Sequence, residues 1–133
     1  MSTKLDHVGI AVASLDESLA IYRRLGMREI AREEVPSQKV RTAFLPAGDA
    51  RIELLEPTAG DSPISRFLAR RGPGIHHLCF AVDDLDAVLA LLSTQGYRLL
   101  NPLPVEGAGG RRVAFLHPES GGGVLIELTE HAG

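Results

Sequence analysis

Histidine and glutamate occur at matching positions in the two halves of the chain. His7 and Glu53 in the first half correspond to His77 and Glu127 in the second. Imidazole nitrogens and carboxylate oxygens together suit a divalent ion such as cobalt, manganese, nickel, iron or zinc, among which the residues do not choose. Such an ion, with positions open for substrate oxygens, would polarise a carbonyl and stabilise the enolate that forms when a neighbouring proton leaves.

An internal repeat supports this pairing. Residues 5–12 recur as residues 75–82, at an offset of 70 positions. The later segments 43–45 and 52–54 recur as 114–116 and 126–128. A repeat of this kind predicts two copies of one structural unit. We expect a pseudo-twofold axis between the copies to bring the four ligands around one divalent metal site.

Strand parity predicts that both histidines have small neighbours. Alternate residues of a strand share a face, so His7 lies with Gly9 and Ala11, and the second copy repeats this around His77. A single strand histidine is more often a hydrogen-bonded core residue than a ligand, and a single strand glutamate usually faces water. Because the repeat provides both residue types twice at equivalent positions, a metal site is the better interpretation.

Each half predicts a strand, a helix and then a run of strands. In the first half, Ser14 begins a capped helix that ends at Gly26. Two extended runs follow at 40–45 and 51–55, and a further strand is expected near 28–35. The pattern predicts an α+β fold.

The second half repeats this order, with Asp83 or Asp84 as the helix cap. Between the halves, Ser-Pro predicts a linker helix at about residues 62–71. Module one is expected at about 4–57 and module two at about 74–130. The expected architecture is two paired β-α-β-β-β modules that form a curved mixed sheet around a metal-containing cavity.

Length and composition limit the class of protein. A chain of 133 residues with 44% hydrophobic residues fits a single domain, residues 1–133. No apolar run approaches the roughly 20 residues that a membrane helix needs, so we expect a cytoplasmic protein without membrane contact. A net charge of −3 and scattered basic residues make nucleic acid a poor candidate partner. The lone Cys79 is more typical of a small buried hydrophobe than of a nucleophile.

Motifs along nearly the whole chain resemble one known family. They are Leu-Asp-His-Val-Gly-Ile-Ala-Val at 5–12, Glu-Leu-Leu-Glu-Pro at 53–57, Asp-Ser-Pro-Ile at 61–64, Gly-Ile-His-His at 74–77, Phe-Leu-His-Pro at 115–118 and Gly-Val-Leu-Ile-Glu-Leu at 123–128. The family is the methylmalonyl-CoA epimerases of the vicinal oxygen chelate superfamily. The first motif is general to the superfamily, whereas Asp-Ser-Pro-Ile, His-His and the two C-terminal motifs are more particular to the epimerases.

The resemblance implies a racemase or epimerase that interconverts (R)- and (S)-methylmalonyl-CoA in propionate metabolism. The proton at C2 would leave and return through a metal-stabilised enolate. His7, Glu53, His77 and Glu127 are the implied metal ligands, and Glu127 is also the implied catalytic base. Cobalt or manganese is the favoured metal, with nickel, zinc, iron and magnesium as alternatives. The expected partner is an acyl-CoA substrate, and similar proteins are often homodimers.

One position departs from the pattern of this family. Some epimerases have a second acid/base glutamate on the strand after a Pro-x-Gln segment, where this chain has Thr42. A threonine is not a general base at neutral pH. Either Glu127 works with water or another side chain as proton donor, or the second group comes from elsewhere in the chain.

Three other functions are compared with this set of ligands and this fold. A glyoxalase-type lactoylglutathione lyase uses similar metal chemistry, so the ligands do not separate it from an epimerase. A metal-free small-molecule binding protein of the same fold is disfavoured because all four ligand positions are filled. An extradiol dioxygenase uses three ligands, so the fourth candidate, Glu53, argues against it.

Other residues with chemical potential rank lower. By strand alternation, His76 faces away from His77 and is expected to be structural. His117 starts a turn and remains a lesser functional candidate. The CoA phosphates need cationic partners, and charge alone provides four candidates, each more typical of a solvated surface: Arg41, Arg51, Arg111 and Arg112.

Overall fold

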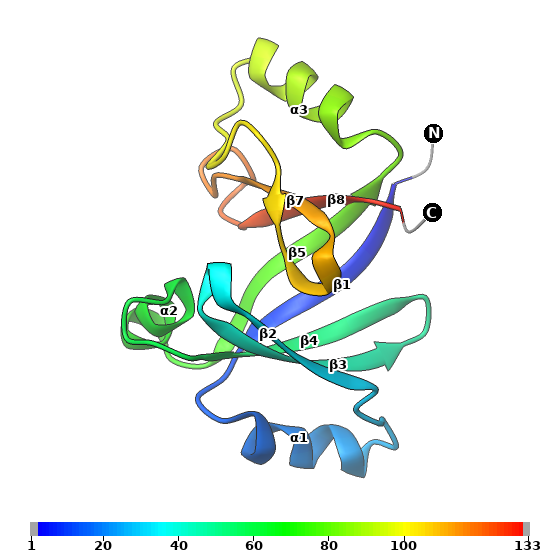
Figure 1. Cartoon of the computed structure of the whole chain (residues 1–133), viewed down its shortest axis with the longest axis vertical. Helices are drawn as coiled ribbons and strands as arrows, with labels where there is room; N and C mark the ends of the chain where they lie inside the picture. The colour runs from blue at the N-terminus through cyan, green and yellow to red at the C-terminus, as the bar shows by residue number, and fades with distance from the viewer. Residues whose placement is uncertain (1–2, 132–133) are drawn as a thin grey trace. The chain divides into compact units, whose positions relative to one another are not determined.

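The computed structural model describes residues 3–131, in which there are three α-helices and eight β-strands (Figure 1). These residues separate into two compact units, His7–His76 and residues 3–6 with 77–131. Each unit contains both parallel and antiparallel strand pairs, and the predicted α+β fold class is confirmed. A single domain with module limits at 4–57 and 74–130 stays a prediction.

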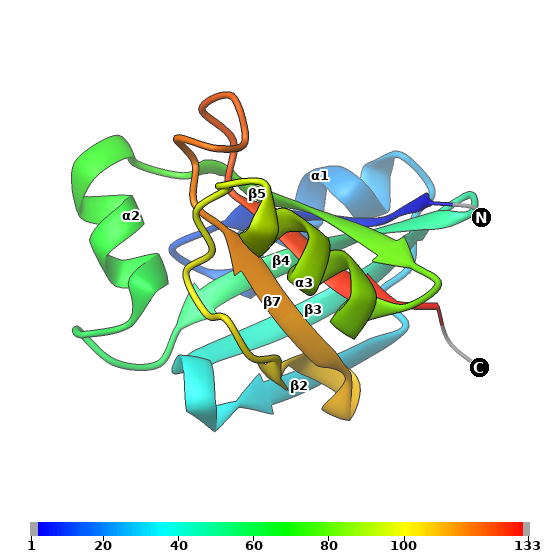
Figure 2. The same ribbon diagram turned by 90° about the horizontal axis from the view of Figure 1, so that it is seen from above.

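The unit His7–His76 has four strands in the order β2-β3-β4-β1. Strand β1 is parallel to β4, whereas β3 is antiparallel to both β2 and β4. Helix α1 covers one face of these strands, and α2 follows the end of β4 (Figures 1 and 2). The elements are β1 (Lys4–Ala11, in this unit from His7 onward), α1 (Leu15–Arg24), β2 (Ala31–Val35), β3 (Val40–Ala47), β4 (Ala50–Pro57) and α2 (Pro63–Arg71).

The second unit repeats this arrangement, with strands in the order β5-β8-β7-β6. Strand β5 is parallel to β8, and β7 is antiparallel to both β8 and β6. Helix α3 packs on β7 and β8 (Figure 2). The elements are β5 (Gly74–Val82, in this unit from His77 onward), α3 (Leu85–Thr94), β6 (Val105–Glu106), β7 (Arg112–Leu116) and β8 (Ile126–Glu130).

Side-chain caps begin the helices as the sequence predicts. The Ser14 hydroxyl accepts a hydrogen bond from the Glu17 amide at 3.3 Å, and Asp84, the second of the two candidate caps, accepts one from Ala87 at 3.1 Å. The expected linker helix is α2, whose cap is Ser62. In the described part of the chain, no helix has both the length and the apolar character needed to cross a membrane.

A second glutamate in each copy also holds a helix start. Glu56 accepts a hydrogen bond from the Leu15 amide at 2.9 Å, and Glu130 accepts one from the Leu85 amide at 3.2 Å. Both carboxylates therefore lie at the positive end of a helix dipole and satisfy an otherwise unpaired amide. The repeated glutamate after each Ile-Glu-Leu segment is thus explained by fold rather than by chemistry.

The core of each unit fixes which way its site glutamate faces. In β4, Leu54 and the partly buried Ile52 pack with Leu15 and Leu19 of α1. Because neighbouring strand residues point to opposite faces, Glu53 lies on the face away from the helix. The second copy repeats this, since the residues that flank the glutamate of β8 pack with α3.

The second copy departs from the repeat at β6. This strand has only two residues, Val105–Glu106, whereas its counterpart β2 has five. Pro102 and Pro104 come just before it, and Gly107 follows. Proline cannot donate to a strand ladder and glycine weakens a strand, so the pairing with β7 stays short.

Candidate active site

The first histidine and glutamate pair lies within the unit His7–His76. Nδ1 of His7 on β1 is 3.0 Å from Oε2 of Glu53 on β4. The pairing of these parallel strands puts Gly9 beside Glu53. Because Gly9 has no side chain, it leaves space for the imidazole of His7, which is two residues earlier in β1 and on the same face. His7 is 6% exposed and Glu53 3%. This unit therefore contains a buried imidazole against a buried carboxylate.

Arg51 adds a positive charge to the first pair. Its Nη2 lies 2.8 Å from Oε2 of Glu53, the same oxygen that faces His7. The guanidinium also lies over the ring of Phe44, 5.4 Å from its centroid. Charge alone had suggested Arg51 only as a candidate partner for a CoA phosphate. Its position two residues before Glu53 in one strand was the available signal, because such residues share a face.

The second pair lies in the other unit. Nε2 of His77 on β5 is 3.1 Å from Oε1 of Glu127 on β8, and each residue is 6% exposed. Strand register places Glu127 between Cys79 and Phe115, and the Phe115 ring meets the His77 ring edge-on at 6.1 Å. In both copies a phenylalanine is thus paired with the site glutamate, Phe44 in the first and Phe115 in the second.

These donors fit a borderline divalent metal. Each unit provides one imidazole nitrogen and one carboxylate oxygen about 3 Å apart, and this mixture is the one that such ions accept. Burial of a carboxylate is costly unless a cation or hydrogen bonds replace its hydration. A metal at either pair would do so.

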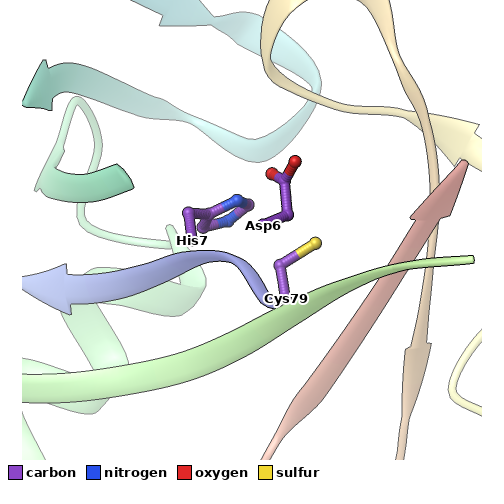
Figure 3. Close-up of side chains that lie close together, drawn as sticks. All are labelled: Asp6, His7 and Cys79. Atoms are coloured by element: carbon purple, nitrogen blue, oxygen red, sulfur yellow. The ribbon is translucent and has the colours of Figure 1, made fainter. Parts of the chain in front are cut away.

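Asp6 of β1 and Cys79 of β5 also lie close together (Figure 3). A carboxylate oxygen of Asp6 and the sulfur of Cys79 are within 4.8 Å of each other. Nη1 of Arg111 lies 2.9 and 3.0 Å from the two Asp6 oxygens, and its Nη2 donates to the Glu130 carbonyl at 2.8 Å. Asp6 therefore forms a structural ion pair within its unit, while Cys79 is fully buried as a small core residue.

The remaining arginine candidates are also engaged with carboxylates. Arg41 lies 2.7 Å from Glu56, and Arg112 lies 2.8 Å from Asp86. The ion pair with Asp86 raises the pKa of Arg112 above its ordinary value. Charge alone had suggested these side chains for a phosphate, but each already has a partner in the fold.

The other histidines have structural contacts. The His76 ring meets Phe67 of α2 edge-on at 5.0 Å. Nδ1 of His117 accepts a hydrogen bond from the Glu119 amide at 3.0 Å. These contacts agree with the expectation that both residues rank below the paired histidines as functional candidates.

Comparison with known proteins identifies the family. Residues 6–115 match the model of the Glyoxalase/Bleomycin resistance protein/Dioxygenase superfamily. The ethylmalonyl-CoA/methylmalonyl-CoA epimerase of Cereibacter sphaeroides is 39% identical, over 98% of this chain and 99% of its own. The methylmalonyl-CoA epimerase structure from Mycobacterium tuberculosis is 45% identical with a TM-score of 0.91, over 97% of this chain and 88% of its own.

The chain belongs to the methylmalonyl-CoA epimerase family. It is an epimerase, as the sequence motifs implied. A solved methylmalonyl-CoA epimerase in complex with methylmalonyl-CoA and NH4+ is 38% identical, with a TM-score of 0.92, and the match covers 100% of this chain and 97% of that one. The match to epimerases of known structure thus extends over the whole repeat and spans the segments that hold both histidine and glutamate pairs.

Proposed function

We propose that this epimerase interconverts (R)- and (S)-methylmalonyl-CoA by removal and return of the proton at C2. The observation that supports this most directly is the buried contact of Glu127 with His77, at 3.1 Å, which the repeat reproduces with Glu53 and His7. Full-length similarity to an epimerase bound to methylmalonyl-CoA supports the same acyl-CoA substrate.

The proposed metal ligands are His7, Glu53, His77 and Glu127. Cobalt or manganese is favoured, with nickel, zinc, iron and magnesium as alternatives. Borderline ions accept imidazole and carboxylate donors together, whereas magnesium prefers oxygen donors. A divalent ion at these residues would supply Lewis-acid stabilisation of negative charge on the substrate. Arg51 lies against the Glu53 carboxylate, so it partly offsets the negative charge of that ligand.

Glu127 is the proposed catalytic base. Burial disfavours the charged form of a carboxylate, whereas a bound divalent metal ion would favour it. A general base works best when its pKa lies near the operating pH, and these two opposing effects can bring it there. The neighbouring His77 and Phe115 restrict the directions that the carboxylate can take. Glu127 would take the C2 proton from one isomer of the substrate.

We further propose that the protein is a cytoplasmic homodimer that acts in propionate metabolism, by analogy with similar proteins. Size-exclusion chromatography with light scattering tests the oligomeric state directly. A mass of one chain at micromolar concentration would contradict the dimer.

The deciding experiment follows the C2 proton in deuterated water. Metal-loaded protein is incubated with (R)- or with (S)-methylmalonyl-CoA, and deuterium incorporation and stereochemistry are measured together. We expect both exchange and conversion. A parallel assay with glutathione and methylglyoxal tests the lyase: turnover there without C2 exchange would replace the epimerase proposal.

A further inference from the structure

Glu33 of β2 lies directly opposite Thr42 of β3 in an antiparallel pair. Residues opposed in this way point to the same face of a sheet, with Cβ atoms about 4.5–5.5 Å apart. Thr42 is in turn opposite Leu55 of β4 and is 1% exposed. The face that holds Thr42 is therefore a buried one, and the Glu33 side chain starts at its border.

This is also the face that holds the first half of the proposed metal site. Phe44 shares a face with Thr42 by alternation and lies directly opposite Glu53. Glu53 contacts His7 on the same side of the strands. Glu33, Thr42, Glu53 and His7 thus belong to one face within a single unit.

The residues on either side of Glu33 point the other way. Arg32 lies opposite Ala43, a core residue beneath α1, and its guanidinium reaches Asp16 of that helix at 2.6 Å. Glu34 lies opposite Arg41 and pairs with it at 3.2 Å. Both neighbours are exposed, whereas Glu33 is partly buried. The register of β2 on β3 therefore keeps Glu33 on the site face and its two neighbours on the other face.

Inversion at a carbon needs proton donors and acceptors on both faces of that carbon. The proposed function gives one of these roles to Glu127, and Thr42 has no suitable group for the other. We propose, on the basis of that function, that Glu33 is the second acid/base residue. In one direction the Glu127 carboxylate takes the C2 proton and the Glu33 carboxylic acid gives its own proton to the opposite face. The reverse direction exchanges these roles. Between turnovers in the same direction, water takes the proton from Glu127 and returns one to Glu33, so that protons balance over the cycle.

Thr42 fits this assignment because it is small. Neighbouring strands lie about 4.8 Å apart, so the backbone of Glu33 on β2 is about 4.8 Å farther from β4 than the backbone of residue 42 on β3. An extended glutamate side chain is about as long as this spacing between strands. A larger residue than Thr42 would fill the space over which the Glu33 carboxylate must reach.

The test separates removal of the C2 proton from inversion. In Glu33→Gln, the Glu127 carboxylate still removes the proton and returns deuterium to the same face. We expect conversion between isomers to fall by about 100-fold or more, the usual effect of losing a positioned acid/base group. Deuterium exchange without inversion should persist for one isomer of methylmalonyl-CoA. Glu34→Gln, the adjacent change on the opposite face, should leave both rates within about threefold of wild type.

A rescue experiment completes the test. The double variant Glu33→Gln with Thr42→Glu moves the carboxylate across the strand pair, and conversion should recover at least tenfold over Glu33→Gln. Conversion within threefold of wild type in Glu33→Gln alone would overturn the assignment, as would loss of exchange for both isomers or absence of rescue. If wild-type protein neither exchanges nor converts the substrate, the proposed function itself fails and this inference falls with it.

Discussion

Nδ1 of His7 lies 3.0 Å from Oε2 of Glu53, and the repeat reproduces this contact with a different ring nitrogen. In the second copy Nε2 of His77 lies 3.1 Å from Oε1 of Glu127. Glu53 also contacts an arginine, Arg51. The two pairs are therefore alike in residue type and burial, and the first has in addition a guanidinium against its carboxylate.

Metal binding should depend on both histidines. We expect chelator-treated protein to bind one Co²⁺ or Mn²⁺ per chain, and His7→Ala or His77→Ala to weaken binding by more than the roughly 10–100-fold typical of outer-shell changes. A metal concentration of 100 times the Kd should stabilise the wild type by about 2.7 kcal/mol, or roughly 10 °C in Tm. Calorimetric titration and thermal unfolding measure both quantities. His117→Ala is the matched control, and equal loss of affinity there would contradict the assignment.

Glu127→Gln should abolish turnover while part of the metal affinity remains. The amide keeps an oxygen donor, but it cannot take a proton at neutral pH. We expect conversion of methylmalonyl-CoA to fall by about 100-fold or more. The control is Glu119→Gln, an exposed change in the same unit. Turnover near the wild-type rate in Glu127→Gln would remove this residue as the base.

Arg51 and Glu53 should be energetically coupled. Arg51→Gln removes a charge-assisted hydrogen bond from a buried carboxylate, so the metal-free protein should lose about 1–3 kcal/mol of unfolding free energy. The double variant with Glu53→Gln should lose less than the sum of the single variants, since no buried charge is left without its partner. Urea unfolding of the four proteins measures the coupling. Strict additivity would show that the 2.8 Å contact has no energetic role.

The Arg111 fork should stabilise the second unit. It binds both carboxylate oxygens of Asp6 and the backbone carbonyl of Glu130. The side chains of Arg111 and Asp6 are largely buried. Arg111→Lys keeps the charge but loses the fork, so we expect a loss of about 1–3 kcal/mol in unfolding free energy. Arg98→Lys, at an exposed ion pair, is the control and should change stability by less than about 0.5 kcal/mol. Equal effects of both changes would argue against the fork.

The ion pair between Asp16 and Arg32 should give a pH-dependent contribution to stability. The hydrogen bond that Arg32 donates to the Asp16 carboxylate holds the pKa of this carboxyl below its ordinary value of 3.8. A pKa that is lower in the folded state means that the stabilisation is present above that ordinary value and is lost as the pH falls through the folded-state pKa. Asp16→Asn should therefore lower Tm slightly at pH 7 and low salt, with no difference in strong acid or 1 M salt. A difference that grows towards acid pH would contradict this sign.

Local patterns were sufficient to predict most of the fold. Ser14 and Asp84 were identifiable as helix caps because their side chains satisfy amides a few residues away, which is a local property. The facing of His7 and Glu53 followed from strand alternation, and the repeat indicated that the second half would match. The short β6 was not predicted, because the repeat implied that the second half has a counterpart of β2, which has five residues.

The sequence by itself determined the paired histidines and glutamates, the α+β elements and the epimerase motifs, since all of these depend on residue type and spacing. The tertiary structure decided which side chains meet across strands. The contact of Arg51 with Glu53, the fork of Arg111 on Asp6 and the position of Glu33 opposite Thr42 depend on strand pairing and register. Register is set by the packing of whole strands against their helices, so it is not contained in any short segment.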